Sequence, residues 1–260
     1  TWQHSSPADG PIAMGAGSTN TQRIRRQTAA AVVVAALVVC ALLAMPRVAF
    51  GGEPSWDESW PRFRVYEGVG TGAAFAVSAV VDLGLGPPDD ARWRGPVLLD
   101  RTVRSSVATE SHATAEGVGL ASDVMTGTLI AYPFVVESGV VFAGLHRQRQ
   151  TTLQVALLGA ESFAAASLLT VTGKHLAARQ RPPSDDCAAE GDHNLYCSEE
   201  RNESFPSGHT SLAFTGASYI CTLHEQFDLY GGGWPEPLAC WTSVGVAAAA
   251  GVSRMVSDNH

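Results

Sequence analysis

Long apolar stretches alternate with short polar segments along most of the chain. They are rich in Ala, Leu, Val and small residues, and they lie at residues 29–45, 69–85, 120–145, 153–171, 211–223 and 238–252. Their lengths and their content of strong helix formers predict α-helices, and no long strand-like alternation is evident. Polar, proline-containing segments at residues 87–90 and 182–203 predict two clear loops. We therefore expect an all-α protein.

Carboxylates interrupt the apolar stretches, among them Asp123, Glu137 and Glu161. In a membrane-spanning helix a carboxylate is costly unless it faces the interior of a bundle. In a soluble or peripheral bundle it would lie on a polar helix face. Both interpretations stay open. The basic turn at residues 146–149 would suit a cytoplasmic loop, which would place the two ends of the following helix on opposite sides of a membrane.

The N-terminal residues have the pattern of an export signal. Arg23, Arg25 and Arg26 precede the uncharged apolar run 29–45, and Met14 is a plausible start. This pattern is typical of a cleaved signal peptide or of a retained membrane anchor, and both stay open. We expect three parts: an extension with the signal or anchor (1–51), a connector with a first helical region (52–118) and a catalytic domain (119–260).

The charge balance narrows the range of partners. The chain has 17 Lys and Arg against 25 Asp and Glu, a formal net charge of −8. No nucleic acid is expected as a partner, because neutralising its phosphates needs an excess of basic residues. The content of 45% hydrophobic residues suits a membrane-associated chain, although the mean hydropathy of +0.06 is low for a bundle fully embedded in lipid. An anionic ligand must therefore be held by a local basic cluster.

Four cysteines follow the leader, which itself contains Cys40. Cys187 with Cys197, and Cys221 with Cys240, each flank a polar loop, and an even number in an exported protein is consistent with two disulfides. Cys221 and Cys240 would equally suit small apolar positions of helices, so their pairing stays open. If the basic turn 146–149 is cytosolic, the loop between Cys221 and Cys240 lies in the reducing cytosol as well. A disulfide between them would therefore contradict that membrane topology.

Lys174 and Arg181 form the first of three clusters that carry candidate chemistry. They lie seven residues apart, at the end of an apolar stretch, and Pro182 follows directly. Seven residues are two helical turns, so we expect both cationic groups on one helix face, converging on one anion, with the helix broken by Pro182.

The second cluster opens the stretch 211–223, and the third follows the last one. A sequence Pro-Ser-Gly-His ending at His209 stands at a predicted helix start, where free N–H groups and the positive end of the helix dipole favour a phosphate. Gly208 would let the oxygens approach closely. Arg254 adds a planar fork of donors suited to a phosphoryl group, and His260 follows it.

Together the three clusters resemble the signature K-x6-R-P, P-S-G-H and S-R-x5-H of the phosphatidic acid phosphatase type 2 and haloperoxidase superfamily, over roughly residues 153–260. The resemblance implies a helical bundle of that type. It implies that His260 attacks phosphorus to form a phosphohistidine and that His209 protonates the leaving alkoxide. The other matched residues would bind the phosphoryl oxygens: Lys174, Arg181, Ser207, Gly208 and Arg254.

The family pattern also continues to an Asp four residues past the third-motif histidine, which orients its ring. We therefore expect this chain to be a C-terminally truncated form of the bundle, which leaves the activity of the fragment open.

The resemblance implies a phosphatase that needs no metal and no cofactor. We expect hydrolysis of a phosphate monoester or pyrophosphate, and the export leader and apolar helices favour a lipid substrate at the periplasmic face of an inner membrane. Three alternatives stay open: a soluble periplasmic acid phosphatase acting on small esters, a vanadium haloperoxidase whose vanadate is bound by His260, and a catalytically silent membrane or binding protein. The histidines without a matching role are interpreted as surface or loop residues: His112, His146, His175, His193 and His224.

Overall fold

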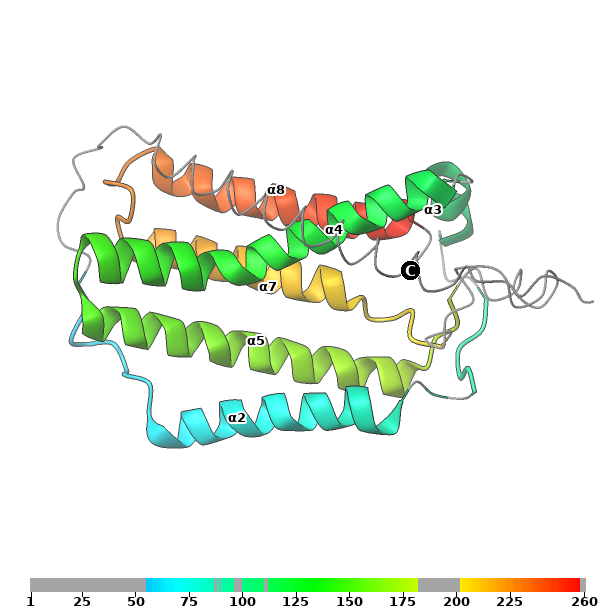
Figure 1. The fold of residues 1–260 in the computed structure, drawn as a ribbon, viewed down its shortest axis with the longest axis horizontal. Helices are drawn as coiled ribbons and strands as arrows, with labels where there is room; N and C mark the ends of the chain where they lie inside the picture. Colours follow the sequence, from blue (N-terminus) through cyan, green and yellow to red (C-terminus); the bar gives the residue numbers. More distant parts are fainter. Residues whose placement is uncertain are drawn as a thin grey trace, which may run out of the picture. The chain divides into compact units, whose positions relative to one another are not determined.

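Long helices account for most of the computed structural model, which describes residues 55–86, 88, 90–95, 100–109, 112–181 and 202–257. In chain order the helices are α2 (Val65–Val80), η1 (Val81–Leu85), α3 (Asp100–Val107), α4 (His112–Tyr132), η2 (Pro133–Leu145), α5 (Arg149–Ala177), α7 (Gly208–Gln226) and α8 (Pro235–Val256) (Figure 1). The elements η1 and η2 are π-helical continuations of α2 and α4. Within the described residues the predicted all-α class is confirmed.

Helices α4, α7 and α8 pack against one another through alanines together with Leu129 and Ile220. Their shared core consists of Leu129, Ala213, Ala217, Ile220, Ala247 and Ala250. A Cβ atom added at Gly216 of α7 would lie 2.3 Å from the backbone oxygen of Leu129 on α4, so the two helices touch through their backbones at this point. On the other side of α7 lies α5, and α2 packs on α5 (Figure 1).

A second core cluster lies toward the other end of α7. It consists of Val141, Phe142, Val155, Leu223, Phe227 and Leu229. The segment before α2 packs here too, because the Trp60 ring lies edge-on to Phe227 with 5.5 Å between the ring centroids. The backbone N–H of Phe63 donates to Gln154 Oε1 at 2.6 Å, which fixes the segment to the first turns of α5.

Two buried carboxylates surround the imidazole of His224 near this cluster. His224 Nε2 lies 3.0 Å from Glu137 Oε1, and Nδ1 contacts Glu236 Oε2. Glu236 Oε1 also accepts the backbone N–H of Tyr230 at 2.7 Å. The interpretation of His224 as a surface or loop histidine is therefore wrong: its side chain is 1% exposed, because carboxylates from η2 and α8 satisfy both ring nitrogens.

A disulfide joins Cys221 of α7 to Cys240 of α8. It lies close to the His224 cluster in the sequence, so the end of α7 and the start of α8 are connected both covalently and by buried polar contacts. The other predicted pair, Cys187 and Cys197, lies outside the described residues.

Among the described residues, four helical segments are long and apolar enough to cross a membrane. They are Val65–Leu85, Thr114–Leu145, Arg149–Ala177 and Pro235–Val256. Many large apolar side chains of these segments face outward, among them Val69, Leu83, Leu169 and Trp241. Glu137, in contrast, is fully buried. These features are compatible with a membrane protein whose apolar surface faces hydrocarbon.

Candidate functional site

Residues from all three sequence motifs line one cavity, which we call the motif cavity. It has a volume of about 440 Å³ and lies where the end of α5, the start of α7 and the end of α8 meet α4. Its walls include Lys174, Arg181, Gly208, His209 and Arg254 of the predicted site, together with Asp82, Asp123, Thr126, Gly127, Ile130, Glu203 and Leu212. Segments distant in the sequence are therefore brought together as the convergence of the motifs predicts.

The second motif forms the first turn of α7. Ser207 is the N-cap residue, and its Oγ accepts the backbone N–H of Thr210 at 3.4 Å and the Thr210 hydroxyl at 3.1 Å. The hydroxyl of Ser207 thus caps the helix, which begins at Gly208 with His209 directly after it. Backbone N–H groups at such a helix start remain available for an anion.

The first motif is built differently from the prediction. Lys174 lies in the last turn of α5, but the helix ends at Ala177, so Arg181 does not share a helix face with Lys174. Ala178 adopts a left-handed conformation with φ of 40°, and its N–H donates to Lys174 O at 2.8 Å. The chain then leaves the helix and pairs with another segment, since Gln180 N donates to Trp93 O at 3.0 Å. Arg181 reaches the motif cavity from this extended segment. Pro182, the expected helix breaker, lies outside the described residues.

Two carboxylates outside the three motifs bind the motif residues. Asp123 Oδ1 lies 2.8 Å from His209 Nε2 and 3.3 Å from Arg254 Nη1, so one carboxylate of α4 contacts both α7 and α8. Glu203 Oε2 lies 3.1 Å from Lys174 Nζ. An isolated carboxylate in an apolar stretch was the available signal for Asp123, whereas nothing in the polar loop 182–203 distinguishes Glu203 from its acidic neighbours.

Glycine permits close packing beside the first motif. A Cβ atom at Gly173 would lie 3.0 Å from Cδ of Pro206, so the α5 end that carries Lys174 can approach the residues before α7. At Gly208 an added Cβ would meet only Thr170 Cγ2, at 3.9 Å. The surrounding protein therefore leaves room for a side chain at Gly208, and the motif cavity lies against its backbone.

The third motif is described only in part. Arg254 lies in the last turn of α8 and its side chain is 12% exposed, whereas His260 lies outside the described residues. The predicted nucleophile therefore has no position here. Within the part of the chain that the structure describes, no group of three His, Cys, Asp or Glu side chains could hold a metal ion. The expectation of metal-free and cofactor-free chemistry stays a prediction.

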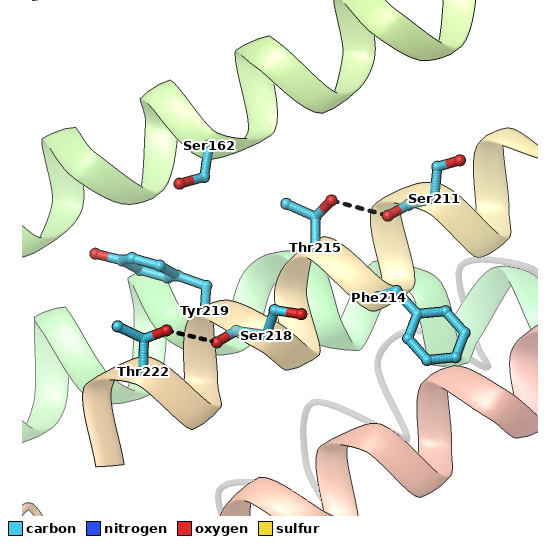
Figure 2. Close-up of a pocket in the computed structure, with 7 residues that line it drawn as sticks. All are labelled: Ser162, Ser211, Phe214, Thr215, Ser218, Tyr219 and Thr222. Atoms are coloured by element: carbon cyan, nitrogen blue, oxygen red, sulfur yellow. Dashed lines mark hydrogen bonds between the residues drawn. The ribbon is translucent and has the colours of Figure 1, made fainter. Parts of the chain in front are cut away.

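A second cavity, of about 370 Å³, has a different character. It lies between α5 and α7 and is lined by Ser162, Ser211, Phe214, Thr215, Ser218, Tyr219 and Thr222, without a charged side chain (Figure 2). Several of these hydroxyls are bonded within their own helices, for example Thr215 Oγ1 to Ser211 O at 2.8 Å. The motif cavity is thus the one of the two that offers groups for binding an anion.

The described chain is an all-α protein in which a cavity with basic and histidine side chains lies among the ends of its long helices. Residues 155–260 match the family model of the PAP2 superfamily, a phosphatase-type superfamily. The resemblance predicted from the three motifs is confirmed for this segment. No curated protein and no solved structure matches the chain.

Proposed function

We propose that the protein hydrolyses a phosphate monoester or pyrophosphate of a lipid through a phosphohistidine intermediate. The observation that carries the proposal is the motif cavity, which gathers side chains of all three motifs against the first turn of α7. Lys174, Arg181 and Arg254 would bind the non-bridging phosphoryl oxygens. Their positive charges would stabilise the negative charge on those oxygens in the transition state.

In the proposed reaction, a ring nitrogen of His260 attacks phosphorus while the bond to the leaving oxygen breaks. His209 gives its proton to that oxygen, so the alcohol departs neutral. A water molecule, deprotonated by His209, then attacks the phosphohistidine, which releases inorganic phosphate and restores both histidines. Histidine suits both roles because it changes its protonation state near neutral pH.

Asp123 would be a positioning residue in this scheme. Its carboxylate holds Nε2 of His209 at 2.8 Å, and a partner on one ring nitrogen fixes the direction of the other. The same oxygen lies 3.3 Å from Arg254 Nη1, so the proton donor and a phosphate-binding guanidinium would share one support.

A lipid substrate is supported by the surroundings of the motif cavity. Ile130 and Leu212 contribute apolar surface to its wall, next to the charged groups. The candidate spans would place the protein in the membrane that contains such a lipid. The N-terminal apolar run supports export, and the basic turn 146–149, at the other end of α5 from the cavity, favours the cytosolic side. We therefore propose a site facing the periplasm.

The test is phosphate release by the purified full-length protein without added metal. Phosphatidic acid, a polyprenyl pyrophosphate and a small aryl phosphate are compared, each beside a His209→Ala variant. We expect turnover that is selective for the lipids and that falls at least about 100-fold in the variant, as is typical for loss of a general acid. Equal turnover of the aryl phosphate would favour an acid phosphatase acting on small esters. No turnover of any ester would contradict the proposal and favour a vanadate-dependent oxidation or a silent binding protein.

A further inference from the structure

Acidic side chains balance the basic ones around the motif cavity. Three basic residues line it, Lys174, Arg181 and Arg254, and so do three acidic residues, Asp82, Asp123 and Glu203. A carboxylate close to a bound phosphate repels it, and this repulsion is stronger in a partly desolvated cavity than in water. Acidic residues in a phosphate site therefore oppose binding of the phosphate.

The side chain of Glu203 is more buried than that of Asp123, the other carboxylate that pairs with motif residues. Its side chain is 7% exposed, against 45% for Asp123, and its partner Lys174 is 16% exposed. Burying either charge alone would be costly, so each stabilises the other where few water molecules reach them. Lys174 is thus already paired before any phosphate arrives.

The backbone around Glu203 is anchored on both sides. The Asn202 side chain donates to Pro88 O at 2.7 Å, and Ser204 N donates to Arg179 O at 3.0 Å. These bonds do not involve Lys174, so the backbone that carries Glu203 stays at the cavity wall when a phosphate contacts the lysine. A phosphate bound by Lys174 would therefore remain close to the negative charge of Glu203.

We propose that Glu203 is an internal counter-anion that competes with the phosphoryl group for Lys174 and thereby promotes release of inorganic phosphate after each turnover. This inference rests on the proposed function for its role in turnover, but its effect on phosphate affinity is independent of catalysis. The tetrahedral product and the carboxylate share one ammonium group. When the phosphate leaves, Glu203 again neutralises Lys174, so the empty cavity does not retain a bare buried cation.

The size of the effect follows from the charge that is removed. At an effective dielectric constant of about 20, a unit charge about 6 Å from the phosphate changes its binding by a factor on the order of 100. Solvent in the open part of the cavity reduces this factor. We expect the Glu203→Gln protein, whose amide oxygen can still accept a hydrogen bond from Lys174, to bind inorganic phosphate about tenfold more tightly than the wild type.

The experiment measures phosphate binding by titration calorimetry on the full chain in detergent, and inhibition of ester hydrolysis by inorganic phosphate. Glu225→Gln, an exposed residue near the end of α7, is the matched control for loss of one negative charge and should leave both values unchanged. Glu203→Asp keeps the charge but draws it back by one methylene group. It should show an intermediate gain of about threefold, and it provides the test if Glu203→Gln does not fold.

Unchanged or weaker phosphate binding by folded Glu203 variants would overturn the inference. It would also be overturned if neither the wild type nor any variant bound phosphate measurably. The inference and the proposed function can fail separately. Tighter binding in Glu203→Gln without turnover of any ester by the wild type would overturn the proposed function alone. Turnover with unchanged phosphate affinity would overturn the counter-anion alone.

Discussion

Asp123 is the residue through which two motifs are held together. It lies on α4, outside the segment 155–260 that matches the superfamily, yet it contacts His209 of α7 and Arg254 of α8. A positioning role predicts an effect on the chemical step, because the ring direction matters most when the proton moves.

For Asp123→Asn we expect kcat to fall by at least about tenfold, with a smaller change in KM, since proton transfer contributes roughly 100-fold or more to such reactions. Steady-state kinetics on a lipid phosphate provides the measurement. Glu116→Gln, an exposed residue of the same helix, should behave like the wild type. Asp123→Glu, which keeps the carboxylate, should recover part of the loss. A change confined to KM would contradict the positioning role.

His224 is expected to matter for stability. Replacing it by Leu leaves Glu137 and Glu236 as buried carboxylates without the imidazole that contacts both, and breaking such a buried pair typically costs about 3–5 kcal/mol. Thermal or denaturant unfolding in detergent should show this decrease in the free energy of unfolding. The neighbouring Glu225→Gln should change it by less than about 0.5 kcal/mol. Equal stability of the two variants would show that the buried cluster contributes little.

The sequence could predict the motif residues better than their partners. Lys174, His209 and Arg254 were selected by type and spacing, and they line one cavity. The contacts of Asp123 and Glu203 depend on how α4, α5, α7 and α8 pack, which local patterns do not encode. His224 was misinterpreted for the same reason, because its burial results from residues on two other elements.

At the level of elements, the contact between α4 and α7 depends on Gly216. Its replacement by Ala would place a Cβ atom 2.3 Å from Leu129 O, so the two helices must separate. We expect a loss of about 1–3 kcal/mol in the free energy of unfolding, measured by unfolding in detergent. Gly245→Ala on α8 is the control, because an added Cβ there meets nothing within 4 Å. It should be neutral or stabilising by up to about 1 kcal/mol. Similar effects at both positions would contradict the close contact.

Apolar stretches predicted the long helices well, because each long helix needs a continuous apolar surface for packing. The stretch 120–145 lies within α4 and η2, and 211–223 lies within α7. Short polar α3 carries no such signal and was not predicted. The sequence also did not predict that α5 ends at Ala177, because Ala is a strong helix former. The left-handed conformation of Ala178 accompanies a hydrogen bond to a distant segment, from Arg92 N to Ala178 O.

At the level of the whole molecule, the direction of each described helix sets the number of membrane crossings between residues 55 and 257. The ends of α5 and α8 both lie at the motif cavity, as does the start of α7. Helix α7 must therefore run away from the cavity before α8 returns to it. If the bundle spans a bilayer, α7 is a fifth crossing in addition to the four candidate spans.

Five crossings place residue 55 and residue 257 on opposite sides of the membrane. Reporter fusions at these two positions, one active only in the periplasm and one only in the cytosol, should give opposite signals. With the motif cavity in the periplasm, residue 257 lies on the periplasmic side and the turn 146–149 in the cytosol. Signals from the same side would contradict five crossings. The reverse orientation would place the loop between Cys221 and Cys240 in the oxidising compartment, and the cavity in the cytosol.

The hydroxyl-lined face of α7 in Figure 2 bears on how this helix can enter a bilayer. Hydropathy scales assign each residue the transfer free energy of an isolated side chain. Thr215 and Thr222, however, already donate to the carbonyl oxygens of Ser211 and Ser218 in the same helix. A hydroxyl that donates within its own helix keeps this hydrogen bond when the helix leaves water. The free energy of transferring it into hydrocarbon is therefore smaller than the scale assumes. The free energy of transferring α7 from water into hydrocarbon is accordingly lower than its composition suggests.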